Sequence, residues 1–483
     1  MRGEADGEGT NVMAQETARA YWRFTVLWLI TGSALGILCA LSLLFPQLLA
    51  AHHILGYGRL IAAHRTAIIH GAMFSAVFAS GYSLLPKLTQ AIAIRKHRSL
   101  IFAWAGAAIV LVGLVLILAG HGSGREYADL PVWLALVFWA YLIATAIDIS
   151  TLVMHTRSIV PHPSTGLLLV ATILPAIVYP FALPDWWGVG LFDALRGWIG
   201  WRAIFAGSFA LGAIGVGIWY LGSIKPRVII PGGVFALGIV LLVVPGPLMG
   251  AAHLLDAPMW AGLKAMGAFA AVLGATGLLM VLVAMWRGPV STPPGLLYIA
   301  GLAGLAIACV QGAVMVIPPI HTAFHYTTNT SAHAHLALSA LMMIFLAGAL
   351  MLAPRLTGVR YRGSGRAIAG AGWFIGGMIV LFLFETSAGV LQAAAFSRGL
   401  SAPDWLPMFR WLQLGVLIGG AGAFAGTIML GRSLLRNLRV PIPSPAVVIH
   451  QPDRTEEVTV EEPSDDLMSP DHTDDLLEGG ING

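Results

Sequence analysis

The sequence predicts an all-α integral membrane protein with twelve transmembrane helices, and three observations carry this prediction. Of the 483 residues, 57% are hydrophobic and only 10% are charged, whereas a soluble protein carries about 25% charged residues. Apolar runs of about 20 residues, long enough to cross a bilayer as helices, recur along the whole chain. The first 20 residues are polar and acidic, so we expect no cleavable signal peptide there.

Each expected span is one of these apolar runs. In chain order they are residues 21–44, 61–86, 99–120, 131–154, 166–183, 202–222, 228–255, 259–286, 294–317, 332–354, 367–396 and 409–432. The chain contains 57 glycines, and small residues allow helices in a membrane to approach one another closely. Pro175, Pro231, Pro245 and Pro247 fall inside these runs and indicate kinks or unwound turns.

The distribution of basic residues predicts that both termini are cytoplasmic. With this orientation, eighteen of the 27 Lys and Arg residues lie in cytoplasmic segments and seven lie at outer ends, as the positive-inside rule requires. We therefore expect a cytoplasmic segment over residues 1–20 and a twelve-helix membrane domain over residues 21–440. Residues 441–483 are acidic and poor in aromatics, which predicts a disordered cytoplasmic tail. The expected location is a bacterial-type inner, or cytoplasmic, membrane.

Three histidines are predicted to lie at a similar depth near the outer ends of two spans. They are His64 in the second span and His333 and His335 in the tenth. An imidazole in hydrocarbon is costly without a partner. Residues two apart on a helix point about 200° apart, so His333 and His335 cannot easily bind one metal together. The pattern favours two haems: one held by His64 and a member of the pair, the other bound by the remaining histidine.

No Cys-x-x-Cys-His motif is present, so we expect one or two non-covalent haems of the b type. His70 is about 120° around the helix and about 9 Å along it from His64, and is expected to face another helix. His253, His321 and His325 are expected at the outer surface, as loop residues or neighbours of haem propionates.

Two acids lie in apolar sequence and are candidates for a polar relay. Glu385 in the eleventh span is deep, and we expect a proton-relay role or a hydrogen bond beside a haem. Asp148 lies near the cytoplasmic end of the fourth span, where it could either serve a relay or reach the interface. No continuous polar ladder joins either acid to the outer face, so we do not expect proton pumping.

Three stretches of the sequence resemble subunit I of the haem-copper oxidase superfamily. They are GRLIAAHRTAIIHGAMFSAVFASGYSLLPKL (58–88), CVQGAVMVIPPIHTAFHYTTNTSAHAHLALSAL (309–341) and AGVLQ (388–392). The resemblance extends over nearly all twelve spans. It is closest to the C-family, or cbb-type, cytochrome c oxidases, and features are shared with bacterial nitric oxide reductases. It implies that His64 and His335 bind a low-spin haem and that His333 binds a high-spin haem.

The sequence departs from this family at the second metal. In the family, three further histidines hold a copper or iron beside the high-spin haem, and here Trp201, Leu248 and Met249 stand at those positions. The family's helix-seven tyrosine falls at Leu242, and a glutamate of helix nine falls at Gln311. We therefore expect no copper site of the usual kind, and classical reduction of oxygen or nitric oxide is not expected.

The expected function is a membrane b-type cytochrome of the electron-transport chain. It would pass electrons between a quinol or cytochrome c and a partner redox subunit within the lipid bilayer. One alternative is a catalytic oxidase or nitric oxide reductase subunit with an atypical second metal site. Another is a haem-based sensor or a structural membrane subunit. The sequence contains no phosphate-binding loop, no nucleophile triad and no nucleic-acid-binding patch.

Overall fold

The computed structural model describes residues 2–47, 52–89, 98–154, 162–183, 190–224, 232–287, 291–357 and 364–439. All of them belong to one unit, Met1–Ile442. The acidic tail predicted over residues 441–483 lies outside the described residues.

The first half of the described chain is helical between short connections. Its elements are α1 (Arg2–Leu44), η1 (His53–Leu55), α3 (Tyr57–Thr66), η2 (Ala67–Met73), α4 (Phe74–Thr89), α5 (Arg98–Ala119), α6 (Val132–Met154), α7 (Pro163–Ala182), α8 (Gly190–Ile204), η3 (Phe205–Ala210) and α9 (Leu211–Ile224). The segments η2 and η3 are π-helical turns that continue directly into the helices on either side. Two long spans result, Tyr57–Thr89 and Gly190–Ile224.

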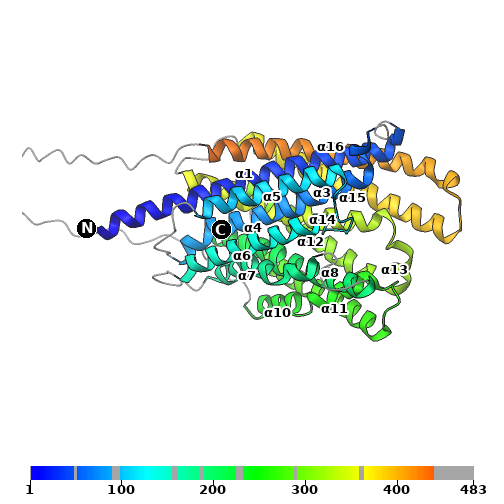
Figure 1. The fold of residues 1–483 in the computed structure, drawn as a ribbon, viewed down its shortest axis with the longest axis horizontal. Coiled ribbons are helices and arrows are strands. Elements are labelled where there is room, and N and C mark those ends of the chain that lie inside the picture. Colours follow the sequence, from blue (N-terminus) through cyan, green and yellow to red (C-terminus); the bar gives the residue numbers. More distant parts are fainter. Residues whose placement is uncertain are drawn as a thin grey trace, which may run out of the picture. The chain divides into compact units, whose positions relative to one another are not determined.

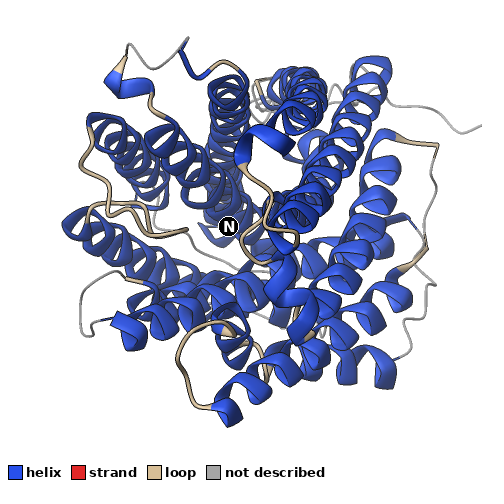
Figure 2. Cartoon of the chain, turned by 90° about the vertical axis from the view of Figure 1, so that its right-hand side faces the viewer, coloured by secondary structure: helices blue, strands red, loops and turns tan. Residues whose placement is uncertain are grey.

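The second half contains α10 (Gly232–Val243), η4 (Pro247–Leu254), α11 (Ala261–Met285), α12 (Pro293–Met315), α13 (Pro318–Phe324), α14 (Thr328–Thr357), α15 (Ser364–Ser397) and α16 (Ala402–Leu438). The helices run along the long axis of the bundle (Figure 1) and are seen nearly end-on in Figure 2. No strand occurs among the described residues.

The expected number of spans is confirmed. Among the described residues, eleven helices are long and apolar enough to cross a membrane, and a bent pair brings the number to twelve. That pair, α10 and η4, is bent by 52° at the break that contains Pro245. A proline lacks a backbone N–H, so it removes one helical hydrogen bond and favours a break, and the predicted unwinding occurs there. By contrast, α7 continues through Pro175. The helix α1 begins at Arg2, and its membrane-spanning part covers Gln15–Leu44, against the expected 21–44.

Burial separates central spans from peripheral ones. In the spans Tyr57–Thr89 and Gly190–Ile224, 94% and 89% of an apolar stretch of 18 residues is buried inside the protein. In α5 the corresponding share is 33%. The outward face of α5 presents large apolar side chains such as Ile101 and Trp104, which are 61% and 62% exposed. Such a face suits contact with lipid, so the two central spans form the interior on which a functional site is built.

The carboxylate of Asp148 binds side chains of two neighbouring helices. Its Oδ2 accepts hydrogen bonds from Tyr82 of α4 at 2.7 Å and from Ser99 of α5 at 2.5 Å. Its Oδ1 pairs with Arg98, whose Nη2 lies 2.7 Å away. Both carboxylate oxygens are therefore occupied by partners that fasten α4, α5 and α6 together. The relay role considered for this residue stays a prediction.

We expect Asp148→Ala to lower the free energy of unfolding by about 2–3 kcal/mol. The substitution leaves the buried Tyr82 hydroxyl without an acceptor, while the half-exposed Arg98 can turn outward, which keeps the cost below that of a fully buried pair. Thermal unfolding in detergent measures the effect. Glu16→Gln is the control, since the Glu16 side chain is 40% exposed and lies 3.8 Å from Arg19, and ion pairs of solvent-exposed carboxylates contribute little. Equal losses in the two variants would contradict this account.

Candidate functional site

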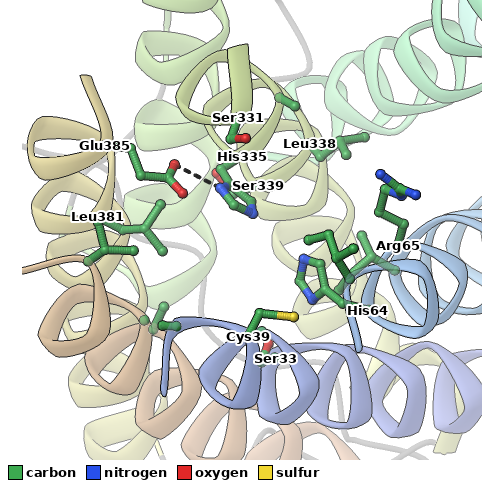
Figure 3. Close-up of a pocket in the computed structure, with 18 of the residues that line it drawn as sticks. Ser33, Cys39, His64, Arg65, Ser331, His335, Leu338, Ser339, Leu381 and Glu385 are labelled. Atoms are coloured by element: carbon green, nitrogen blue, oxygen red, sulfur yellow. Dashed lines mark hydrogen bonds and ion pairs between the residues drawn. The ribbon is translucent and has the colours of Figure 1, made fainter. Parts of the chain in front are cut away.

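A cavity of about 390 Å³ lies between α1, α3, α14, α15 and α16. His64 and His335 line it from opposite walls, and Glu385 stands behind His335 (Figure 3). Most of the remaining lining is apolar, and Arg65 and Glu126 also line the cavity. The volume falls within the usual range for small-molecule and cofactor sites.

The two imidazoles face each other across this cavity. Their ring centroids are 5.8 Å apart and the ring planes cross at 67°. Nδ1 of His64 lies 2.8 Å from the Gly32 carbonyl oxygen, and Nδ1 of His335 lies 2.8 Å from Oε2 of Glu385. Both of these partners accept, so each Nδ1–H donates and, in the neutral imidazole, each Nε2 keeps a lone pair. This tautomer is the one that binds a metal through Nε2.

The backbone of α1 makes room for His64. A Cβ atom at Gly36 would lie 3.1 Å from Cε1 of the His64 ring, so a larger residue would press on the imidazole. The adjacent turn of α1 supplies the Gly32 carbonyl that fixes the ring. Two opposed imidazoles with free Nε2 atoms, in a large and mainly apolar cavity, fit a planar haem with two axial ligands.

Charged residues gather around the part of the cavity lined by Arg65. The Arg65 guanidinium makes two hydrogen bonds to Asp129, at 3.0 and 2.7 Å. Burial raises the pKa of the Asp129 carboxyl to about 6, although Arg65 opposes the shift. Burial likewise raises the pKa of Glu126. The same cavity is thus apolar over most of its wall and polar in one part.

A second cavity, of about 180 Å³, lies on the other side of α14. His333 lines it together with Arg202 and Met249, while His335 lines only the first cavity. The two histidines therefore serve different cavities, as their spacing on one helix requires. Nδ1 of His333 is buried and has no hydrogen-bond partner within the described chain. A Cβ atom at Gly312 would lie 3.0 Å from Cε1 of His333, so this ring also packs against a glycine.

The three residues at the family's second-metal positions occupy different environments. Met249 lines the second cavity, where Arg202 Nη2 lies 3.6 Å from its Sδ atom. Leu248 is 39% exposed and lines neither cavity. Trp201 is 2% exposed and packs 5.5 Å from the His70 ring. His70 itself lies 3.0 Å from the Tyr179 hydroxyl through Nε2, so it contacts another helix and neither cavity.

Three histidines expected at the outer surface, as loop residues or neighbours of haem propionates, line the second cavity. They are His253, His321 and His325. His321 is only 4% exposed, so a surface position is wrong for that residue. Arg202 also lines this cavity, and it was not a predicted site residue. The four-residue spacing of His321 and His325 was a usable signal, because it puts both on one face of a helix.

Comparisons with known proteins agree with this architecture. The family model described as "Cytochrome C and Quinol oxidase polypeptide I" matches residues 16–436. A protein of Agrobacterium tumefaciens (strain T37) named cytochrome c oxidase subunit 1 homolog is 26% identical over 366 residues. That match covers 69% of this chain and 65% of the relative, so the chain spans just under two thirds of that relative's length.

Two further comparisons cover more of the chain. The cbb3-type cytochrome c oxidase subunit CcoN1 of Stutzerimonas stutzeri is 22% identical over 89% of this chain and 96% of its own length. A solved structure of a heme-copper terminal oxidase dimer has the same fold, with a TM-score of 0.73 at 14% identity, covering 89% of this chain and 84% of that one. The resemblance seen in the sequence is confirmed, and the chain belongs to the cytochrome c and quinol oxidase polypeptide I family, subunit I of the haem-copper oxidases.

Proposed function

We propose that this subunit I homologue is a membrane b-type cytochrome that carries electrons through a low-spin haem held by His64 and His335. The observation that carries the proposal is the pair of facing imidazoles, 5.8 Å apart between centroids, with both Nδ1 atoms bound to acceptors. A haem bound there would supply one-electron redox chemistry.

The protein's own contribution is to orient and tune the two ligands. The Gly32 carbonyl and the Glu385 carboxylate fix the tautomer and the direction of the two rings. The walls contributed by α1, α14 and α16 are mainly apolar around the ligand atoms. The carboxylate of Glu385 adds a buried negative charge next to one ligand. This role is our interpretation of the acid that the sequence offered as a relay.

We further propose that His333 binds a second haem from one side, in the second cavity. The fit is supported by the buried imidazole, whose Nδ1 has no partner among the described residues, and by the glycine at position 312. We propose no copper site of the family's usual kind, since tryptophan, leucine and methionine side chains replace the three imidazoles. Of the three, only Met249 reaches this cavity.

The proposed setting is a bacterial cytoplasmic membrane, with both termini cytoplasmic. Electrons would pass between a quinol or a cytochrome c and a partner redox subunit. The relative from Stutzerimonas stutzeri is by its name a subunit of a cbb3-type oxidase, which supports a partner within a membrane complex. The competing function is a catalytic oxidase or nitric oxide reductase with an atypical second metal. The observation that favours it is the lining of the second cavity by His253, His321 and His325.

A reduced-minus-oxidised spectrum of the purified chain, with haem quantitation, metal analysis and carbon monoxide addition, tests the proposal. We expect a low-spin b-type spectrum, two haems per chain, no copper, and carbon monoxide binding that disappears in His333→Ala. A single low-spin haem that does not bind carbon monoxide would show that His333 holds no haem. Absence of any haem would overturn the proposal, and a second redox metal with rapid oxygen or nitric oxide turnover would support the catalytic alternative.

A further inference from the structure

Three metal-ligating side chains converge beside the second cavity. They are Asp256, in the turn that follows η4, His321, within α13, and His325, the residue directly after α13. One ligand atom from each lies within 4.8 Å of the other two. His321 and His325 line the second cavity and Asp256 does not, so the cluster lies at the edge of that cavity. None of the three belongs to the proposed low-spin haem site.

The two histidines are held side by side by the helix. They are four residues apart, and the His325 amide donates to the His321 carbonyl oxygen at 2.8 Å, which extends the helical turn to His325. Their rings stack with centroids 4.3 Å apart and an interplanar angle of 29°. Two histidines spaced four apart on one helical face form a common metal-binding pair.

His321 has the arrangement of a metal ligand. Its Nδ1 lies 3.3 Å from the Met315 carbonyl oxygen, so the Nδ1–H donates, and in the neutral imidazole Nε2 carries a lone pair. Nε2 is buried and lies 3.2 Å from Oδ2 of Asp256, with which it forms an ion pair only when the imidazole is protonated. In the neutral ring the lone pair and the carboxylate oxygen face each other, and a cation between the two atoms would bind to both.

We infer that Asp256, His321 and His325 bind a divalent transition-metal ion, with Zn²⁺ as the test ion. Two imidazoles and one carboxylate suit zinc and neighbouring metals, whereas Ca²⁺ and Mg²⁺ prefer oxygen ligands alone. With bonds of about 2.0–2.1 Å, tetrahedral ligand atoms lie about 3.4 Å apart, so small side-chain rotations complete the site. The ion would fasten the segment after η4 to α13 at the edge of the second cavity.

The test uses the full-length chain purified in detergent without a histidine tag. Zn²⁺ is added, excess is removed by gel filtration, and zinc and haem are measured per chain on the same sample. We expect about one zinc ion per chain. Asp256→Asn, on a side chain that is 28% exposed, is the primary variant because it leaves the fold least disturbed. It and His325→Ala should weaken zinc binding at least about tenfold.

His121→Ala is the control, since His121 is an exposed histidine in the turn after α5. It should leave zinc binding unchanged, and Asp256→Asn should leave the low-spin haem spectrum unchanged. Zinc binding that is absent in the unmodified chain, or that survives Asp256→Asn and His325→Ala, overturns the inference. Haem content is counted separately, so loss of the haem proposal and loss of the zinc site give different results.

Discussion

His335→Ala and His64→Ala are each expected to abolish the low-spin b-type spectrum. Each substitution removes one of the two imidazoles that would hold the haem, and no other histidine among the described residues lines this cavity. Haem retained on the single remaining ligand would be high-spin and open to carbon monoxide. We expect the low-spin haem content to fall at least about tenfold, since even outer partners of a ligand change affinity by that much. Pyridine haemochrome assay and the reduced spectrum measure it.

His70→Ala is the matched control for this experiment. His70 is a buried histidine on the same span as His64, yet it contacts Tyr179 and lines neither cavity. It should keep the low-spin spectrum, even if the chain becomes less stable. A low-spin spectrum that survives in either ligand variant, or that disappears to the same degree in His70→Ala, would show that the imidazole pair does not hold the haem.

Glu385→Gln is expected to raise the midpoint potential of the low-spin haem by about 60 mV or more, a tenfold change in the redox equilibrium. The buried carboxylate accepts from Nδ1 of His335 at 2.8 Å. Its negative charge stabilises the more positive oxidised centre, and the hydrogen bond makes the imidazole a stronger donor. Glutamine keeps the size and an acceptor oxygen but removes the charge. Potentiometric titration followed at the haem band gives the shift.

Asp148→Asn serves as the charge control for the potential. It also neutralises one buried acid, but that acid is paired with Arg98 and lies outside both cavities. Its effect on the midpoint potential should be well under half that of Glu385→Gln. An unchanged or lowered potential in Glu385→Gln would mean that the carboxylate does not act on the haem ligand.

The helical architecture was predictable because each span is long and apolar, and backbone hydrogen bonding in lipid leaves few other options. The break between α10 and η4 was predictable for a local reason, the proline at position 245. The opposite directions of His333 and His335 follow from helical periodicity alone. Each of these features is determined by residues close together in the sequence, so each can be predicted from the sequence alone.

The contacts between distant segments were not predictable in the same way. Glu385 and His335 are 50 residues apart and meet only because α14 and α15 pack in one register. His321 was expected at the surface, but the short helix α13 places it in a buried position. Asp256 was not a predicted site residue, because no residue near it in the sequence indicates a metal site. Only the fold brings it close to His321 and His325.

The π-helical turn η2 has a consequence for comparing this chain with its relatives. It lies between His64 and the rest of the span, at Ala67–Met73, and a π turn contains one residue more than an α turn over the same rise. A relative that lacks this turn would need a one-residue gap in the alignment there. Without that gap, every position from the turn to the end of α4 would be matched to a neighbour about 100° around the helix, and a buried residue would be equated with a lipid-facing one.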